Sequence, residues 1–195
     1  MENQDIKIYI SKLPQGASKD QEKLVGEKLV ERACKEHGVG CEIVYGPHGK
    51  PYLKDGRVFF NLSHSHGAVV CAVAKFELGC DIEKIRPIGG KVGEKFFATS
   101  EKELLSACTS DREREALFFR LWTLKESLVK ATGDGLYKNF HTFSISFDEF
   151  GNPMPVISDG REYHFFEPKI MDGYSFALCS EKENGKITTE IVDFD

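Results

Sequence analysis

Two acidic side chains, Asp81 and Glu83, lie two residues apart in the segment LGCDIEKI. Alternate residues of a β-strand point to the same face, so the two carboxylates would lie about 6.5–7 Å apart. Neighbouring carboxylates repel unless a cation lies between them, and hard oxygen ligands with open positions suit magnesium completed by water and phosphate oxygens. The same pattern also fits an exposed strand face with two solvated acids, which the spacing alone favours.

A second pair of charges lies on a segment of helical pattern from about residue 111 to 131, which ends before Gly133. Its apolar stripe recurs at helical spacing through four leucines, Leu117, Leu121, Leu124 and Leu128. Glu126 and Lys130 project away from that stripe and are one turn apart. They could form an ordinary intrahelical pair worth a few tenths of a kcal/mol. On a helix this apolar, however, charged groups favour a metal or phosphate ligand.

Two further segments carry candidate groups. In FNLSHSHG, Ser63 and His64 follow a predicted strand, where hydroxyl, imidazole and backbone N–H groups can hold phosphate oxygens. The same stretch also fits a polar hairpin turn or, through its H-x-H pattern, a metal site. Glu101, in FFATSEKELL, is expected in the first turn of a helix, where the helix dipole favours acids in any case.

Composition restricts the class of protein. The chain has 195 residues, a net charge of −5 and 41% apolar residues, which is ordinary for a globular domain and unlike a general nucleic-acid binder. No stretch has the pattern of a membrane span or a signal peptide, so a cytoplasmic protein is expected. The six cysteines form no C-x-x-C pair, which favours reduced, mostly buried thiols over a zinc or disulfide framework.

Several elements must position these groups. Ser18 followed by Gln21 fits a capping box for a helix that reaches about residue 37 and ends at Gly38. A helical stretch is expected around residues 91–97, followed by a helix capped at Thr99 or Ser100. The order of elements indicates an α+β fold with mainly antiparallel strands. Strands are expected at residues 6–10, 58–62, 68–76, 80–85, 142–147, 163–166, 174–179 and 187–192.

Together the motifs resemble one family, the 4′-phosphopantetheinyl transferases, and within it the larger monomeric type that activates biosynthetic synthetases. The resemblance extends from about Gly49 to Gly135, with the motifs in the family's order and spacing. The matching stretches are GKPYL, FNLSHSHG, LGCDIEKIRP, FFATSEKELL and LWTLKESLVKATGDGL.

This resemblance implies a pseudo-twofold monomer of two similar α+β halves, residues 1–98 and 99–195, with coenzyme A in the cleft between them. It implies that the magnesium ligands are Asp81, Glu83 and Glu126. It implies that the residues contacting coenzyme A are Lys50, Pro51, Ser63, His64 and Lys130. The catalytic residues that it implies are Glu101 as the base, Lys130 and Glu126. Glu22 occupies a position where the resemblance leads us to expect a basic residue near the adenosine phosphate.

The implied activity is magnesium-dependent transfer of the 4′-phosphopantetheine group from coenzyme A to a serine of an apo acyl or peptidyl carrier protein, with release of 3′,5′-ADP. A carrier is expected to dock at Arg86, Lys91 and Lys95, although this segment also fits a solvated amphipathic helix. Two other functions are compatible with the same pocket. One is a magnesium-dependent coenzyme A phosphohydrolase, and the other is a non-catalytic coenzyme A-binding module.

Overall fold

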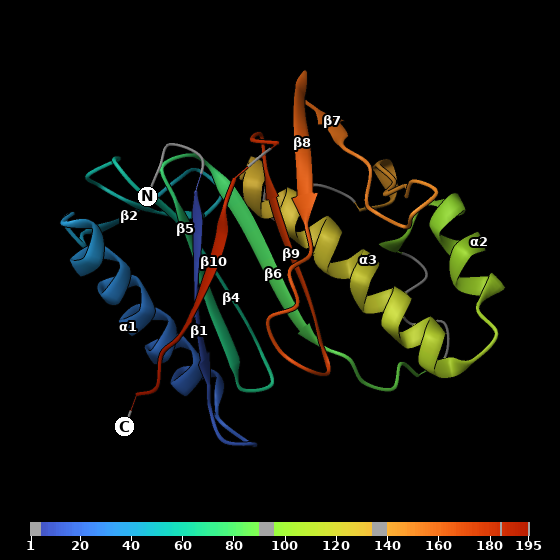
Figure 1. The fold of residues 1–195 in the computed structure, drawn as a ribbon, viewed down its shortest axis with the longest axis horizontal. Helices are drawn as coiled ribbons and strands as arrows, with labels where there is room; N and C mark the ends of the chain where they lie inside the picture. Colours follow the sequence, from blue (N-terminus) through green and yellow to red (C-terminus); the bar gives the residue numbers. More distant parts are fainter. Residues whose placement is uncertain (1–4, 90–95, 134–139, 184, 195) are drawn as a thin grey trace.

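Two four-stranded sheets lie face to face, and a helix covers the outer face of each (Figure 1). The computed structural model describes residues 5–89, 96–133, 140–183 and 185–194. The first sheet has the order β10 (Ile187–Ile191), β1 (Ile6–Lys12), β5 (Ala68–Ala74) and β4 (Phe59–Ser65). The second has the order β6 (Leu78–Lys84), β9 (Tyr174–Ser180), β8 (Arg161–Phe166) and β7 (Val156–Ser158).

The remaining elements are three α-helices, a hairpin and a short 3₁₀-helix: α1 (Lys19–His37), α2 (Thr99–Ala107), α3 (Asp111–Thr132), β2 (Ile43–Tyr45) with β3 (Pro51–Leu53), and η3 (Phe140–Thr142). Among the paired strands of the described chain, β1 and β10 run parallel and the others antiparallel. This arrangement confirms the expected α+β class with mainly antiparallel strands. When the chain is divided at residue 98, each sheet contains an edge strand from the other half, namely β10 and β6.

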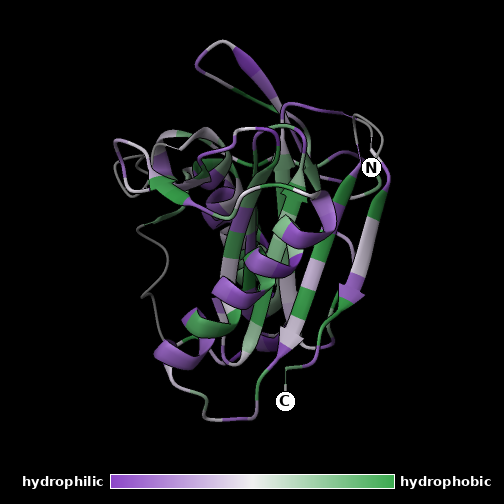
Figure 2. Cartoon of the chain, turned by 90° about the vertical axis from the view of Figure 1, so that its left-hand side faces the viewer, coloured by the Kyte–Doolittle hydropathy of each residue, from purple (hydrophilic) through white to green (hydrophobic). Residues whose placement is uncertain are grey.

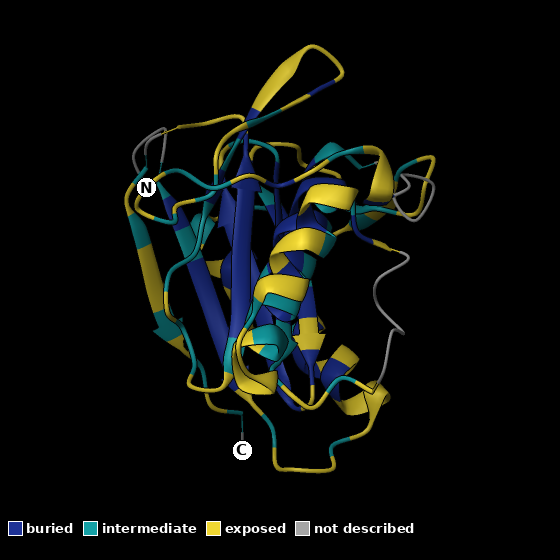
Figure 3. Cartoon of the chain, turned by 90° about the vertical axis from the view of Figure 1, so that its right-hand side faces the viewer, coloured by how far each residue is buried: buried dark blue, intermediate teal, exposed yellow. Residues whose placement is uncertain are grey.

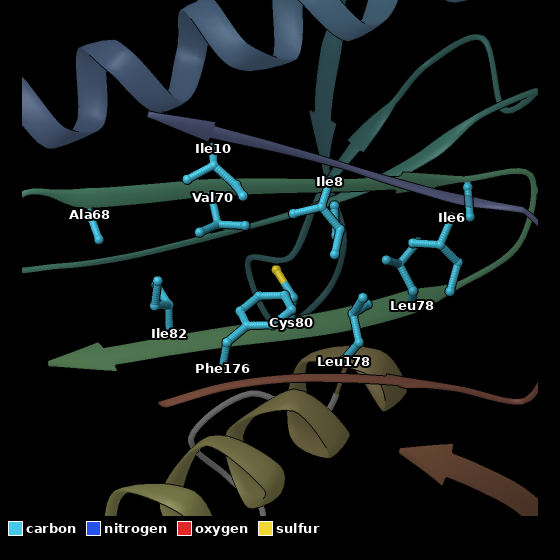
Figure 4. Packing of buried hydrophobic residues seen from close by; sticks show 12 residues of the cluster. Ile6, Ile8, Ile10, Ala68, Val70, Leu78, Cys80, Ile82, Phe176 and Leu178 are labelled. Atoms are coloured by element: carbon cyan, nitrogen blue, oxygen red, sulfur yellow. The ribbon is translucent and has the colours of Figure 1, made fainter. Parts of the chain in front are cut away.

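Three apolar cores hold the layers together. Isoleucines of β1 face alternate residues of β6 and β9 across the space between the sheets, as the side chains in Figure 4 show. A second core lies between α1 and the first sheet, and a third between α3 and the second sheet. Each strand near the centre therefore buries both faces, which explains why β5 is a continuous apolar run, AVVCAVA, with every residue buried.

Helix α1 follows its sequence signals closely. The Ser18 hydroxyl accepts from the Gln21 N–H, the Gln21 side chain accepts from the Ser18 N–H, and Gly38 ends the helix in the left-handed conformation. Figure 2 shows that side of the molecule, where hydrophilic and hydrophobic residues alternate along the helix and the strands. Figure 3 shows the opposite side, where buried strands lie behind exposed helix faces and loops.

Two expectations about the second half of the chain are corrected. Helix α2 begins at Thr99, so its N-cap is Ala98 rather than Thr99 or Ser100. No strand forms at residues 142–147, where the described chain has only the end of η3 and an isolated bridge at Phe147. The alternation of apolar and polar residues there has another cause, since Phe143, Ile145 and Phe147 all pack into the core beneath α3. The helix expected around residues 91–97 falls mostly outside the described residues.

None of the six cysteines forms a disulfide, and four of them are buried: Cys34, Cys71, Cys80 and Cys179. None of the helices in the described ranges combines the length and the apolar composition that crossing a membrane requires.

Gly79 allows α3 to lie directly against β6. A β-carbon on Gly79 would lie 2.1 Å from the Ser127 carbonyl oxygen and 2.3 Å from the Ala131 nitrogen. A glycine within a strand commonly marks such a close backbone approach. This contact brings the C-terminal half of α3 over the strand that carries Asp81, and so positions the candidate site.

Replacing Gly79 by alanine is therefore expected to destabilise the fold by about 2–3 kcal/mol, because backbone rather than a flexible side chain must move. Gly26 in α1 is the matched control. A β-carbon at Gly26 would make only ordinary contacts, the nearest with Leu62 at 3.6 Å. Because alanine has a higher helix propensity than glycine, Gly26→Ala should add up to about 1 kcal/mol of stability. Urea unfolding of both variants measures the difference. Equal effects of the two substitutions would contradict the close approach.

Candidate functional site

The two sheets meet where side chains of β4 bind the backbone of β6. Three polar residues on one face of β4 accept hydrogen bonds from alternate N–H groups of β6. The pairs are Cys80 N to Asn61 Oδ1 at 2.9 Å, Ile82 N to Ser63 Oγ at 3.1 Å, and Lys84 N to Ser65 Oγ at 3.2 Å. The serine hydroxyls also donate to Asp81 and Glu83, both at 2.7 Å. Both acids of the D-x-E motif are therefore held at this junction.

Lys130 reaches this junction from α3. Its ammonium group lies 2.6 Å from Asp81 Oδ1 and donates to the Cys80 carbonyl at 3.1 Å and to Ser63 Oγ at 3.2 Å. The intrahelical pair with Glu126 that the spacing allowed is not formed, since none of the ion pairs between described residues joins the two. Burial would lower the pKa of Lys130, but the adjacent Asp81 carboxylate raises it above its ordinary value. Lys130 is therefore a charged group held in place beside Asp81.

Glu126 extends this group of charges. Its pKa is raised to about 7, first by burial and then by the negative charges of Asp81 and Glu83, while Lys130 acts in the opposite direction. Burial also raises the pKa of Asp81, against the effect of Lys130. The three carboxyl groups thus influence one another electrostatically although they come from β6 and α3.

The chemistry of these donors fits a hard divalent cation. Asp81 Oδ2 is buried and has no hydrogen-bond partner in the described structure, which leaves one carboxylate oxygen available as a ligand. The geometry is less complete. Within the described ranges no three His, Cys, Asp or Glu side chains form a cluster that could hold a metal ion. The Lys130 ammonium group lies against the other oxygen of Asp81.

The raised pKa of Glu126 predicts a pH effect on stability in metal-free protein. A carboxyl group with a folded pKa of about 7 and an ordinary value of 4.5 stabilises the fold when protonated, and this contribution is lost as pH rises from about 4.5 through 7. Glu126→Gln should therefore be more stable than the wild type at pH 8, by up to about 3 kcal/mol, and close to it at pH 4.5. Chemical unfolding with a chelator present measures this difference, and a gap that does not depend on pH would refute the raised pKa.

A cavity of about 210 Å³ adjoins Lys130. Lys50 and Pro51 border it together with Lys130 and Gly133, so three of the residues expected to contact coenzyme A surround one space. The Lys50 ammonium group is held by Glu77 at 2.6 Å and by the Ala131 carbonyl at 3.2 Å. The hairpin β2–β3 and the end of α3 thus form the two sides of this cavity.

Ser63 and His64 are not brought together. As neighbours on β4 they point to opposite faces. Ser63 is buried against β6, whereas the half-exposed His64 contacts the Glu22 carboxylate on α1, with Nδ1 and Oε2 2.8 Å apart. Glu22 also accepts from the Gly67 N–H at 2.6 Å. The acid found where a basic residue was expected therefore fastens α1 to the β4–β5 turn.

Glu101 lies inside the protein and is held by its neighbours. It is fully buried, and both of its oxygens are occupied. Oε2 accepts from the Ala98 N–H at 2.8 Å, and Oε1 accepts from the Ile145 N–H at 2.7 Å and lies 2.9 Å from the Lys125 ammonium group. These contacts give Glu101 a structural role, because they join α2 to α3 and to the backbone of Ile145. The expected role of Glu101 as the base, directly or through water, stays a prediction.

Lys125 is the partner that sequence reasoning missed. It is fully buried, and its ammonium group also donates to the carbonyls of Phe140 and Phe143 at 2.7 and 2.6 Å. These contacts hold residues 140–145 against α3 in place of the expected strand. A signal was present, because Lys125 follows Leu121 by four residues and so lies within the apolar stripe of the helix.

A second cavity, of about 380 Å³, begins at Glu83 and is lined mainly by apolar side chains. Its aromatic wall is formed by Phe96, Phe118, Phe119 and Trp122. Arg86 lies at its edge, 3.2 Å from Glu83 Oε2 and with its guanidinium carbon 4.7 Å from the centre of the Phe119 ring. Of the expected docking residues, Arg86 therefore borders the site, while Lys91 and Lys95 lie outside the described residues.

Comparison with known proteins places these features in context. The family profile described as the 4′-phosphopantetheinyl transferase superfamily matches residues 77–179. A 4′-phosphopantetheinyl transferase of Bacillus subtilis is 32% identical over 163 residues, which are 80% of this chain and 72% of that protein. The 4′-phosphopantetheinyl transferase gsp of Aneurinibacillus migulanus is 35% identical over 68% of this chain, but the matched segment spans only 55% of its own length.

Among solved structures, a holo-(acyl-carrier-protein) synthase of Bacillus anthracis matches 53% of this chain and 92% of its own, with 19% identity and a TM-score of 0.47.

Proposed function

This chain belongs to the 4′-phosphopantetheinyl transferase superfamily, and on that premise we propose that it transfers the 4′-phosphopantetheine group from coenzyme A to a serine of an apo acyl or peptidyl carrier protein. The observation that carries the proposal is the position of Lys130. Its ammonium group lies against Asp81 and also borders the cavity of Lys50 and Pro51. A preorganised cation beside an open cavity suits a pyrophosphate whose bridge is to be broken.

In the proposed reaction the serine oxygen attacks the phosphorus atom that bears the pantetheine arm. A phosphorus–oxygen bond forms to the serine, the pyrophosphate bridge breaks, and 3′,5′-ADP leaves with the bridging oxygen. Lys130 offsets the negative charge that develops on that oxygen. Because both oxygens of Glu101 are occupied, we propose that the serine proton passes first to water at the open edge of the cavity, and Glu101 stays the predicted base through that water. Catalysis then rests on positioning and electrostatics, as in other phosphoryl transfers.

We propose that the residues holding magnesium are Asp81, Glu83 and Glu126. The unpartnered Asp81 oxygen and the shared charge of the three carboxyl groups support this assignment. When bound, magnesium would supply positive charge to the pyrophosphate oxygens.

We propose that the carrier approaches over the aromatic cavity beside Glu83. An exposed edge of apolar side chains, with Phe96 38% exposed, offers contact area, and Arg86 adds a positive charge next to the acids. The sequence-based proposal that Lys91 and Lys95 extend this basic surface is retained. We also retain the proposal of a monomer whose site lies between the halves 1–98 and 99–195.

One experiment separates the three candidate functions. The protein is incubated with coenzyme A, magnesium and an apo carrier protein, and the carrier and the small-molecule products are then analysed by mass spectrometry. A carrier that gains one phosphopantetheine group supports transfer. Free phosphopantetheine with an unmodified carrier indicates a hydrolase, and coenzyme A that binds but stays intact indicates a binding module. A parallel reaction with a chelator tests the need for magnesium. Transfer at an undiminished rate in the chelator would exclude a magnesium requirement.

A further inference from the structure

A large cavity, of about 780 Å³, opens at the end of the sandwich where the β1–α1 connection, the β4–β5 turn and the ends of β6 and β9 meet (the lower end in Figure 1). We call it the basic cavity. Residues 12–17 form one side, and His66, Lys84 and Tyr174 form the other. Its volume lies within the range of pockets that bind small organic molecules.

The basic cavity lies on the other face of β6 from the candidate active site. Glu83 and Lys84 are neighbours on that strand and therefore point to opposite faces. Glu83 borders the aromatic cavity near α3, whereas Lys84 lines the basic cavity. Tyr174 packs at the end of the core between the two sheets, which is also on this second face. None of the residues proposed to hold coenzyme A or magnesium lines the basic cavity.

The charged side chains that line the basic cavity are basic. Lys12 and Lys84 line it, and no acidic residue is among its described lining residues. Across the described ranges, no ion pair involves either lysine. The Lys84 ammonium group instead lies 4.5 Å from the centre of the Tyr174 ring. The nearest acid that the contacts show is Glu22, which accepts from the Gly67 N–H at the β4–β5 turn and raises the pKa of Tyr174. Two ammonium groups at one concavity, neither of them in an ion pair with a described residue, still favour the binding of an anion.

The β4–β5 turn adds a third group that can donate to an anion. His66 has a φ of 49°, in the left-handed region, and Gly67 follows with a φ of 83°. The Tyr174 hydroxyl donates to the His66 carbonyl at 2.9 Å, which fixes the turn against β9. An imidazole held at a left-handed position is uncommon, although histidine tolerates it better than most residues do. The turn thus carries an exposed imidazole at the rim of the basic cavity.

We propose that the basic cavity is a second binding site, separate from that for coenzyme A, which takes a small phosphate ester with an aromatic or apolar body. Lysine ammonium groups bind phosphate as point charges, and His66 can donate a further hydrogen bond. The apolar part of the ligand would lie against Leu13, Pro14 and Tyr174, which line the same space.

The test uses phenyl phosphate as the probe, in calorimetric titrations of the full chain at constant ionic strength. Saturable binding is expected in the wild type, and Lys12→Gln and Lys84→Gln should each weaken it by about tenfold. Lys75→Gln is the matched control. It removes the same charge at the opposite end of β5, about 20 Å from the turn, and should leave the affinity unchanged. Thermal unfolding of each variant confirms that it is folded.

Three further arms decide what the basic cavity binds. His66→Asn preserves the left-handed turn and removes the imidazole, so a loss of a few fold is expected. Inorganic phosphate should bind more weakly than phenyl phosphate, because it lacks the apolar body. Saturating coenzyme A should not change the affinity for phenyl phosphate. The proposal is overturned if wild-type binding does not saturate, if Lys75→Gln weakens it equally, if inorganic phosphate binds as tightly, or if coenzyme A displaces the probe.

Discussion

Asp81→Asn is expected to lower the rate of carrier modification by about 10²–10³-fold while the protein stays folded. Asparagine has the same shape and keeps an oxygen that can accept from Ser63 and Lys130, which bind Asp81 Oδ1 at 2.7 and 2.6 Å. What is lost is the negative charge. Without it Lys130 is no longer held electrostatically at the cavity, and the proposed magnesium site loses a ligand. Mass analysis of the carrier over time measures the rate.

Stability should change little in this variant, because burial already disfavours the charge on Asp81, as its raised pKa shows. Asp172→Asn is the control. It removes a carboxylate that is 88% exposed and pairs with Lys169 on the surface, so neither rate nor stability should respond. An Asp81→Asn protein that modifies the carrier at the wild-type rate would exclude Asp81 from the site. A variant that unfolds would instead make Asp81 primarily structural.

Lys125→Met is expected to destabilise the fold by about 3–5 kcal/mol, the cost of leaving one member of a buried ion pair without its partner. Methionine fills the space of the lysine stem, but Glu101 then keeps a buried charge with only two backbone N–H donors. The carbonyls of Phe140 and Phe143 also lose their donor. In a domain of this size the loss corresponds to a melting temperature about 10 °C lower, measurable by calorimetry.

A double-mutant cycle makes this prediction specific. Glu101→Gln combined with Lys125→Met removes both charges. The double variant should therefore lose less stability than the sum of the losses measured for the two single variants. Lys102→Met is the control. Lys102 follows Glu101 on α2 and is only partly buried, so its substitution should change stability by less than about 0.5 kcal/mol. The cycle also tests the predicted role of Glu101. If Glu101→Gln is as stable as the wild type yet fails to modify the carrier, Glu101 acts as the base; if it modifies the carrier normally, Glu101 is structural only.

Local interactions explain which elements could be predicted. The capping box of Ser18 and Gln21, the αL position of Gly38 and the leucine stripe of α3 all depend on residues within about four positions of one another. They specify the same structure in any tertiary context, and the structure confirms these helices to within a residue or two. The strands with a buried face were found for the same reason, although their ends moved by up to three residues.

The pattern of residues 143–147 shows the limit of such signals. The alternation of apolar and polar residues shows that one face of this segment is apolar. It does not show which groups form hydrogen bonds with the backbone of the segment. Here a buried ammonium group and a buried carboxylate bind that backbone, so it has no neighbouring strand. Those two charges come from α3 and α2, whose approach depends on packing between elements that are distant in the sequence.

The sequence by itself predicted the acids and the lysine of the proposed site, because the motifs around LGCDIEKI and LWTLKESLVKATGDGL together resemble one family, whose profile matches residues 77–179. Only the tertiary structure decided their partners. Lys130 meets Asp81 rather than Glu126 because Gly79 lets α3 lie against β6, which brings the lysine within 2.6 Å of a residue 49 positions away. Spacing along a helix limits which side chains can meet within that helix, but it contains no information about which strand the helix will cover.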